Sequence, residues 1–143
     1  MKGPLVVLTL GTLVITGLVR GGEGKKDKAA LQGTWSATVK DKKFVLELKG
    51  DKFTATIDEN EVYKGTFKID PSQSPKHIDF TIKEGDKWVN QTSLGLYELT
   101  GDKLKWCANE PGKDQRPSEF AEKMGEQRLL LVVLERQKKK KKD

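Results

Sequence analysis

The side chains that could support catalysis or bind a metal are few in this chain of 143 residues, which has one His and one Cys. A single Cys excludes an internal disulfide framework and any zinc site built on paired cysteines. Ser118 has neither a nearby His nor a Gly-x-Ser-x-Gly elbow, so it lacks the groups that activate a nucleophilic serine. His77 alternates with apolar residues in the same way as Asp79, so both are expected on the polar face of a strand. This favours a surface histidine over a metal ligand.

Carboxylates offer two further candidates. The acidic turn at residues 58–61 could attract Ca²⁺, but its spacing lacks the alternating ligands and closing Glu of an EF-hand loop, which favours a solvated turn. Asp70 with Asp79 or Glu98 could form a carboxylate pair, whose separation a sequence does not set. With no catalytic arrangement and no metal-ligand spacing, we expect a protein that is not an enzyme and that has no cofactor.

Cys107 and Arg116 are single residues with competing interpretations. Cys107 shares its parity with Lys105, opposite Trp106. A lone Cys can be a reactive thiol or pair between chains, but it also fills buried space, and we favour burial. Arg116 is expected to tie the following loop to a backbone carbonyl or to Glu119.

The net charge of +6 belongs to the two ends of the chain. Lys2 and Arg20 lie in residues 1–22, and residues 138–143 hold five Lys and one Asp. The 20 basic and 20 acidic residues between these ends balance. Proteins that bind nucleic acid usually carry a basic face on the domain itself, so we expect no nucleic-acid partner.

Residues 1–22 have the features of a signal peptide. A positive residue precedes the uncharged run Leu5–Val19, which is too short for a comfortable membrane span but suits a signal-peptide core. Small residues suited to cleavage are Gly17 and Gly21. We expect export to the periplasm, the cell envelope or the medium; an uncleaved anchor or a buried helix is the alternative.

Two polar segments border the predicted domain at residues 31–137. Residues 23–30 are rich in Gly and Lys and predict a linker. Residues 138–143 predict a disordered tail, because the Lys138–Lys142 run repels itself. That run could bind an anionic envelope surface, or it could be a solvated tail without a partner.

The domain itself alternates apolar and polar residues with a period of two, which indicates half-buried strands. A first strand surrounds Trp35, and the others are expected at 44–48, 53–57, 63–69, 78–82, 94–100, 103–108 and 129–134. The last of these is apolar throughout, which suggests cover on both faces. Gly50-Asp51 and Gly101-Asp102 are hairpin signals. We therefore predict an all-β, eight-stranded antiparallel up-and-down barrel, with a sandwich as the alternative.

Residues 109–127 interrupt the strand pattern just before the last strand. Long irregular stretches are often binding loops or barrel lids. A single helical turn starting near Pro117 fits the preference of proline for a first turn, and Phe120 would then anchor the stretch to the barrel.

The tripeptide Gly33-Thr34-Trp35 on the first strand resembles the opening motif of lipocalins and related calycin barrels. The resemblance implies that Trp35 closes one end of the barrel and that an Arg of the last strand, here Arg136, stacks on it. We expect Gly33 to be required because a side chain would collide at the barrel floor.

A longer ordered series of motifs is similar to an uncharacterised lipocalin-like domain family abundant in planctomycete bacteria. The matching stretches are 31–35, 65–71, 75–80, 96–99, 101–102, 104–107, 111–113 and 116–120. The resemblance covers about residues 30–136 and implies export, a small β-barrel and no assigned activity. Trp106 stands where such domains usually have Leu.

Five aromatic residues are candidates for lining the barrel interior: Tyr63, Phe67, Phe80, Tyr97 and Trp106. Small barrels either hold one small ligand or are filled by side chains. Two functions follow. The first is an exported domain that binds a small apolar ligand, and the second is a non-enzymatic structural or interaction module of the cell envelope with a filled barrel.

Overall fold

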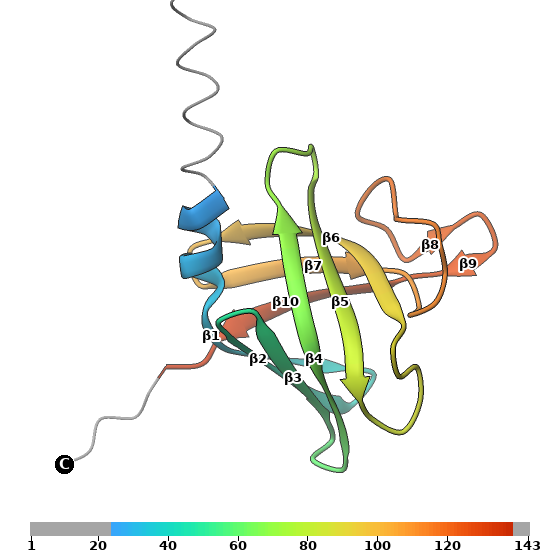
Figure 1. Cartoon of the computed structure of the whole chain (residues 1–143), viewed down its shortest axis with the longest axis horizontal. Coiled ribbons are helices and arrows are strands. Elements are labelled where there is room, and N and C mark those ends of the chain that lie inside the picture. The colour runs from blue at the N-terminus through green and yellow to red at the C-terminus, as the bar shows by residue number, and fades with distance from the viewer. Residues whose placement is uncertain (1–23, 139–143) are drawn as a thin grey trace, which may run out of the picture.

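Eight strands pair into one closed antiparallel barrel in the computed structural model, which describes residues 24–138 (Figure 1). Around the barrel the order is β1-β10-β7-β6-β5-β4-β3-β2. The barrel strands are β1 (Gly33–Val39), β2 (Lys42–Lys49), β3 (Lys52–Ile57), β4 (Glu61–Asp70), β5 (Lys76–Glu84), β6 (Thr92–Thr100), β7 (Lys103–Ala108) and β10 (Leu130–Arg136). The predicted all-β barrel of eight antiparallel strands is confirmed, because every predicted strand is present and each pairs with its neighbour in sequence until β10 closes the ring.

Glycines permit tight turns between strands and one close approach of two neighbouring strands. Gly50 and Gly101 have φ of 62° and 59° and begin the two-residue turns of the β2–β3 and β6–β7 hairpins, as their sequences predicted. Gly65 lies at a register shift between β4 and β5, where an added Cβ would be 1.9 Å from the carbonyl oxygen of Thr81. No side chain fits there, so Gly65 lets the two strands approach each other.

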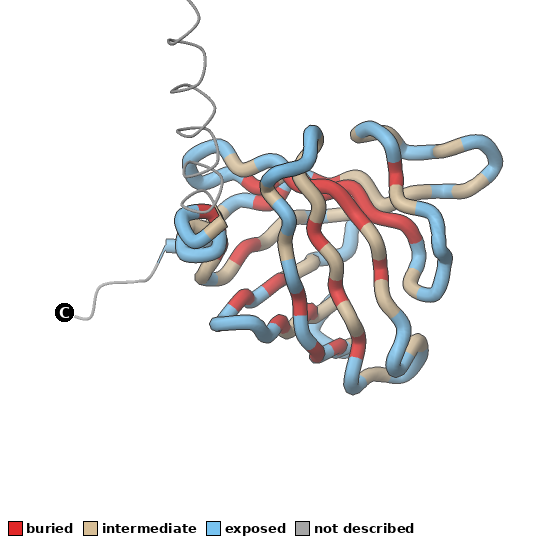
Figure 2. Tube along the Cα trace, turned by 45° about the horizontal axis from the view of Figure 1, so that its top comes forward, coloured by how far each residue is buried: buried red, intermediate tan, exposed pale blue. Residues whose placement is uncertain are grey.

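The interior of the barrel is filled from one end by large apolar side chains. Figure 2 shows the alternation of buried and exposed residues along the strands that produces this core. The largest fully buried side chains include Trp35, Leu46, Leu48, Tyr97 and Leu134. Because strand residues alternate between the two faces, each strand contributes every second residue to the interior.

Residues 24–31 are helical and pack against one end of the barrel, to the left in Figure 1. The linker predicted for residues 23–30 is therefore wrong for 24–30. The helix is held by long-range contacts that composition does not reveal, namely the fully buried Leu31 and the buried Asp27. We call this end of the barrel the helix end and the opposite one the open end.

The segment between β7 and β10 is a long loop without a helical turn. It contains the small hairpin of β8 (Lys123–Met124) and β9 (Gln127–Arg128). Pro117 is fully buried and anchors the loop, whereas Phe120 is only half-buried, with Lys105 Nζ 4.9 Å from its ring centroid. Of the two forms predicted for this stretch, the long irregular loop is confirmed. The helical turn is absent and Phe120 is not the anchor, because Pro117 packs into the body instead of starting a helix.

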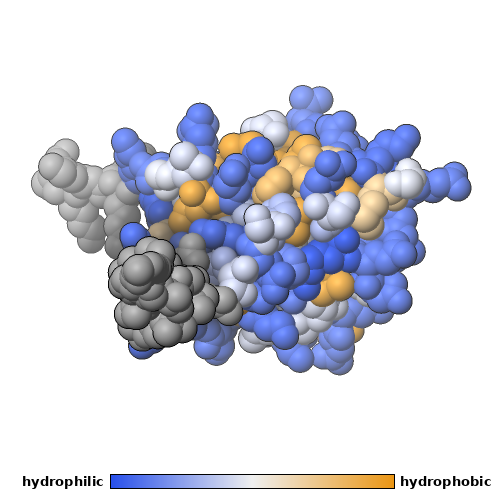
Figure 3. Space-filling view, turned by 90° about the horizontal axis from the view of Figure 1, so that it is seen from above, coloured by the Kyte–Doolittle hydropathy of each residue, from blue (hydrophilic) through white to orange (hydrophobic). Residues whose placement is uncertain are grey.

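The outer face of β10 is partly uncovered, which corrects the expectation of cover on both faces. Val133 is 49% exposed, because no element crosses the outside of β10 at that position. Figure 3 shows a mostly hydrophilic surface on which a band of apolar side chains remains visible.

No helix among residues 24–138 is long and apolar enough to span a membrane. The predicted signal peptide at 1–22 and all but Lys138 of the predicted tail at 138–143 lie outside the described residues.

Candidate functional site

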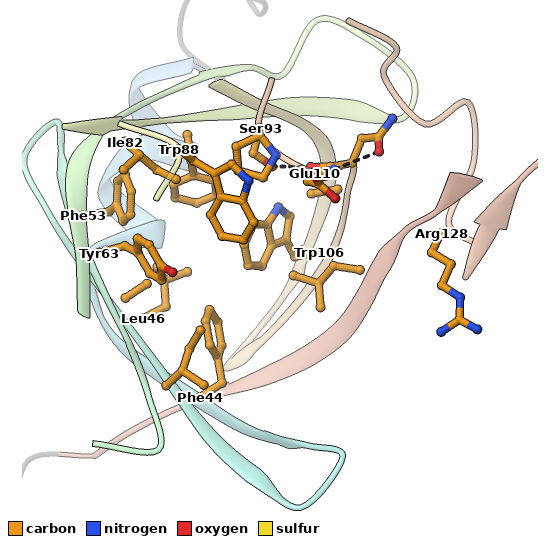
Figure 4. A pocket seen from close by; sticks show the side chains of 17 residues that line it. Phe44, Leu46, Phe53, Tyr63, Ile82, Trp88, Ser93, Trp106, Glu110 and Arg128 are labelled. Atoms are coloured by element: carbon orange, nitrogen blue, oxygen red, sulfur yellow. Dashed lines mark hydrogen bonds between the residues drawn. The ribbon is translucent and has the colours of Figure 1, made fainter. Parts of the chain in front are cut away.

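A cavity of about 300 Å³ occupies the interior of the barrel near its open end (Figure 4). Strands β2, β3, β4, β5, β7 and β10 contribute inward-facing residues to its wall, and the loops after β5 and β7 contribute its rim. Its aromatic lining consists of Phe44, Phe53, Tyr63, Phe80, Trp88 and Trp106. The cavity is therefore a mainly apolar pocket with an aromatic wall.

Four of the six aromatic rings of the wall form a connected cluster centred on Phe80, and Tyr63 and Trp88 form a separate pair with ring centroids 5.7 Å apart. The Phe80 ring centroid lies 5.0 Å from that of Phe53 and 4.9 Å from that of Trp106, both in edge-to-face arrangements. Phe44 stacks on Trp106 at 6.0 Å. Such pairs contribute about 0.5–1.5 kcal/mol each beyond the area they bury, so the wall is held in place before any ligand arrives.

Three of the five predicted lining residues do line the pocket, and two do not. Tyr63, Phe80 and Trp106 border the cavity. Phe67 lies nearer the helix end and packs beneath Phe80, with ring centroids 5.9 Å apart. Tyr97 also lies at the helix end, where its hydroxyl donates to Asp27 Oδ2 at 2.7 Å. The prediction fails for these two because alternation tells which face a residue occupies and not its height along the barrel.

Three aromatic lining residues were not among those predicted from the sequence, namely Phe44, Phe53 and Trp88. Phe44 and Phe53 lie on predicted strands, and their alternation with polar residues is a signal that could have included them. Trp88 lies in the β5–β6 loop with φ of 65°, outside any periodic pattern. Backbone hydrogen bonds from Asn90 to Ile82 and from Gln91 to Trp88, at 2.6 and 2.9 Å, fold that loop back over the barrel mouth.

Polar groups at the rim of the pocket satisfy one another. Asn109, which is 3% exposed, donates through Nδ2 to Gln115 O at 2.9 Å and to Gln127 Oε1 at 2.6 Å. Ser93 Oγ donates to the Asn109 carbonyl at 2.8 Å. The guanidinium of Arg128 is turned away from the cavity (Figure 4). The only other charged residue of the lining is Glu110, which is exposed at the rim, so the inner wall carries no charged side chain.

Two polar atoms belong to the wall itself. The Tyr63 hydroxyl donates to Glu61 Oε2, and burial, followed by the hydrogen bond and charge of Glu61, raises the pKa of Tyr63. Tyr63 therefore stays neutral. Trp106 Nε1 is buried with no hydrogen-bond partner among the described residues, and it lies against Gly95, where an added Cβ would be 3.1 Å away.

The helix end of the barrel is closed by Trp35, as the resemblance implied. The Arg136 guanidinium carbon lies 4.3 Å from the centroid of the Trp35 ring, and Trp35 Nε1 donates to Leu31 O at 2.9 Å. A Cβ on Gly33 would come within 3.0 Å of Arg136 Nη1. The glycine of the motif thus leaves room for the arginine.

The other chemical candidates of the sequence are not brought together. Asp70 accepts hydrogen bonds from Ser72 and Gln73, Asp79 from Arg116, and Glu98 lies 3.7 Å from Lys105, so no catalytic pair of these carboxylates forms. The turn at residues 58–61 holds no ligand cluster, and none exists in the described part of the chain.

Arg116, Cys107 and His77 all have structural surroundings. Arg116 Nη1 donates to the Gly95 carbonyl at 2.9 Å, as expected, and to Asp79 at 2.6 Å instead of Glu119. Cys107 is buried beneath the β7–β10 loop, and burial raises the pKa of its thiol. His77 is half-buried, and burial followed by the nearby Arg116 charge lowers its pKa.

The fold and the pocket define a class: a small antiparallel β-barrel that is closed at one end by Trp35 and holds an aromatic pocket at the other. Comparisons with protein-family models, with curated proteins and with solved structures find no match to this chain.

Proposed function

We propose that this protein binds a small, largely apolar molecule inside its barrel. The observation that carries the proposal is the cavity of about 300 Å³, a volume at the lower limit of ligand-sized clefts, which run to ~300–1,000 Å³. Its walls are aromatic rings and aliphatic side chains, and transferring apolar ligand surface to such walls contributes about 25 cal/mol per Å².

The preferred ligand is uncharged. The polar groups at the rim hydrogen-bond to one another through Asn109, and the Arg128 side chain is turned away. A charged ligand would lose its hydration without gaining a partner inside the pocket, and burying an unpaired charge is strongly unfavourable. A neutral aromatic or aliphatic ligand loses little hydration and gains ring contacts.

The wider context of this function is part of the same proposal. The Gly33-Thr34-Trp35 motif with Arg136 across the ring supports membership of a lipocalin-like, calycin-type family. The uncharged run Leu5–Val19 supports export to the periplasm, the envelope or the medium. We propose binding without catalysis, since Cys107 and His77 lie on the outside of the barrel wall, away from the cavity.

The second candidate function is a non-enzymatic structural or interaction module. It is favoured by the filled half of the barrel near the helix end, where Trp35, Leu48 and Tyr97 are fully buried. In this case the cavity would be a packing defect that binds no ligand. Ligand binding is the stronger proposal because the cavity opens at the barrel mouth, among loops, and is not sealed within the core.

A fluorescence titration tests the proposal. N-phenyl-1-naphthylamine, an uncharged aromatic probe, should bind the full chain with increased emission and quench tryptophan fluorescence, because Trp88 and Trp106 border the cavity. The variant Ala55→Phe places a ring inside the pocket and should weaken probe binding by about tenfold or more, the equivalent of ~1.4 kcal/mol.

The matched control is Ala29→Phe, which adds the same ring to an exposed position of the helix. It should bind the probe like the unmodified chain. If both variants bind the probe equally well, the probe is not in the barrel. If the unmodified chain binds neither this probe nor any molecule detected by native mass spectrometry, the structural module is the correct function.

A further inference from the structure

Exposed lysines gather at the helix end of the barrel. They come from the helix, from the β2–β3 and β6–β7 hairpins and from the exit of the chain after β10: Lys25, Lys26, Lys49, Lys52, Lys103 and Lys138. None of these six has a carboxylate at ion-pair distance within residues 24–138.

The acidic residues of the same end are largely occupied by other cations. Asp27 pairs with Lys76 at 2.9 Å, Asp51 pairs with Lys28, and Asp102 pairs with Arg136 at 3.0 Å. Asp70 accepts hydrogen bonds from Ser72 and Gln73. The helix end is therefore a basic face, although the described body of the chain is nearly neutral as a whole.

Hydrogen bonds hold the elements of this basic face together. The Gln32 side chain accepts from Gly50 N at 2.6 Å and donates to Gly50 O at 3.1 Å, which fixes the β2–β3 hairpin to the end of the helix. Arg136 donates to Ala30 O at 2.6 Å and to Gln32 O at 2.7 Å, which fixes the chain exit beside the helix. The lysines thus act from one rigid surface.

The open end has the opposite charge balance. Its connections carry more acidic than basic side chains, and six of the exposed acidic ones are Asp41, Asp58, Glu59, Asp86, Glu110 and Asp114. The barrel is consequently polarised along its axis. An anionic surface would attract the helix end and repel the end that holds the pocket mouth.

The basic face contains a groove lined by both cationic and apolar side chains. It has a volume of about 390 Å³ and lies between the helix and β4. Lys25, Lys28 and Lys68 line it together with Asp51, and Ile69 and Pro71 contribute apolar wall. Cationic groups beside apolar wall suit a phosphate attached to a glycerol backbone.

We infer that the helix end of this barrel docks on a membrane surface that contains anionic phospholipids and holds the pocket mouth away from it. The chain enters the described domain at residue 24, within this face, and the uncharged run Leu5–Val19 precedes it in the sequence. Lys138, the last described residue, lies on the same face, and four more Lys follow it in the sequence. A basic face whose lysines lie beside the apolar Ile69 and Pro71 matches a lipid surface better than a nucleic acid.

Vesicle sedimentation of the full chain measures this docking. With vesicles of phosphatidylcholine containing about one third phosphatidylglycerol, each lysine near the surface should strengthen binding about fivefold. The variant Lys25→Gln, Lys26→Gln, Lys49→Gln, Lys52→Gln should bind about a hundredfold or more weakly than the unmodified chain. Binding should also fall with added salt, because the lysines are exposed.

The matched control removes the same charge from the open end, in the variant Lys40→Gln, Lys42→Gln, Lys43→Gln, Lys113→Gln. All four positions are exposed. It should bind the anionic vesicles like the unmodified chain or slightly more weakly. Both variants should bind N-phenyl-1-naphthylamine as before, so a failure of docking is distinguished from a failure of the proposed ligand binding.

Three results would overturn the inference. Equal losses in the two variants would mean that net charge alone, and not this face, attracts the chain. Undiminished binding of the helix-end variant would assign the attraction to segments outside this face, namely the Leu5–Val19 run or the lysine-rich tail. Binding of a short DNA duplex as tight as binding to the vesicles, with the same loss in the helix-end variant, would identify the face as a nucleic-acid surface.

Discussion

Arg136 lies across the ring of Trp35, with its guanidinium carbon 4.3 Å from the ring centroid, although the two residues are 101 positions apart in the sequence. The two residues are also direct cross-strand partners of β1 and β10, where the barrel closes. The guanidinium also donates hydrogen bonds to the carbonyls of Ala30 and Gln32. One side chain thus joins the last strand, the floor of the barrel and the helix.

A double-mutant cycle on this pair should give a coupling energy of about 0.5–2 kcal/mol, the range of cation–π contacts. Trp35→Ala should lower the free energy of unfolding by about 3–5 kcal/mol, because it empties a fully buried site. Arg136→Ala should cost less, about 1–3 kcal/mol. Urea unfolding of the four proteins measures the cycle, and additive losses would contradict the contact.

Asp27 should hold the helix to the barrel. Its Oδ2 accepts from Lys76 Nζ at 2.9 Å and from Tyr97 OH at 2.7 Å, so Asp27→Ala should lower the free energy of unfolding by about 1–3 kcal/mol. Lys26→Ala, at the neighbouring exposed position, should change it by less than about 0.5 kcal/mol. Amide hydrogen exchange should accelerate in residues 24–31 for Asp27→Ala alone; equal exchange in both variants would contradict the assignment.

Cys107 should react slowly with a thiol reagent such as dithionitrobenzoate while the protein is folded. Its Sγ is covered by the β7–β10 loop and donates to Ala121 O at 3.3 Å, and burial raises the thiol pKa, so little thiolate is present at neutral pH. The variant Ser118→Cys places a second thiol at an exposed position of the same loop and should react fast. Rapid reaction of Cys107 itself would mean that the loop opens.

The raised pKa of Cys107 also sets a pH dependence. The folded state favours the neutral thiol, so its contribution to stability is complete below the pKa of the unfolded thiol, about 8.5, and is lost as the pH rises above that value. Cys107→Ser, whose hydroxyl does not ionise in this range, should show a smaller loss of stability between about pH 8 and 10. Identical pH profiles would show that another group is responsible.

The alternation of apolar and polar residues and the turn residues were sufficient to predict the barrel from the sequence. Period-two patterns defined four of the barrel strands, the apolar run Leu129–Leu134 indicated the last one, and Gly50 and Gly101 marked two of the hairpins. The Gly33-Thr34-Trp35 resemblance pointed to the contact between Trp35 and Arg136. These features are local or carried by a motif, because the side-chain period of a strand and the φ of a turn depend on neighbouring residues.

Only the tertiary structure decided which aromatic residues border a cavity and where charge accumulates. Phe67 and Phe80 both face the interior of the barrel, but strand tilt and register place Phe80 at the pocket and Phe67 beneath it. The sequence predicted a polar linker at residues 23–30, yet residues 24–31 form a helix that belongs to the fold through the burial of Asp27 and Leu31. The fold also sorts the balanced charges of the body into a basic helix end and a more acidic open end, which the sequence order does not reveal. Position along the barrel axis depends on pairing between distant segments, and no local pattern encodes it.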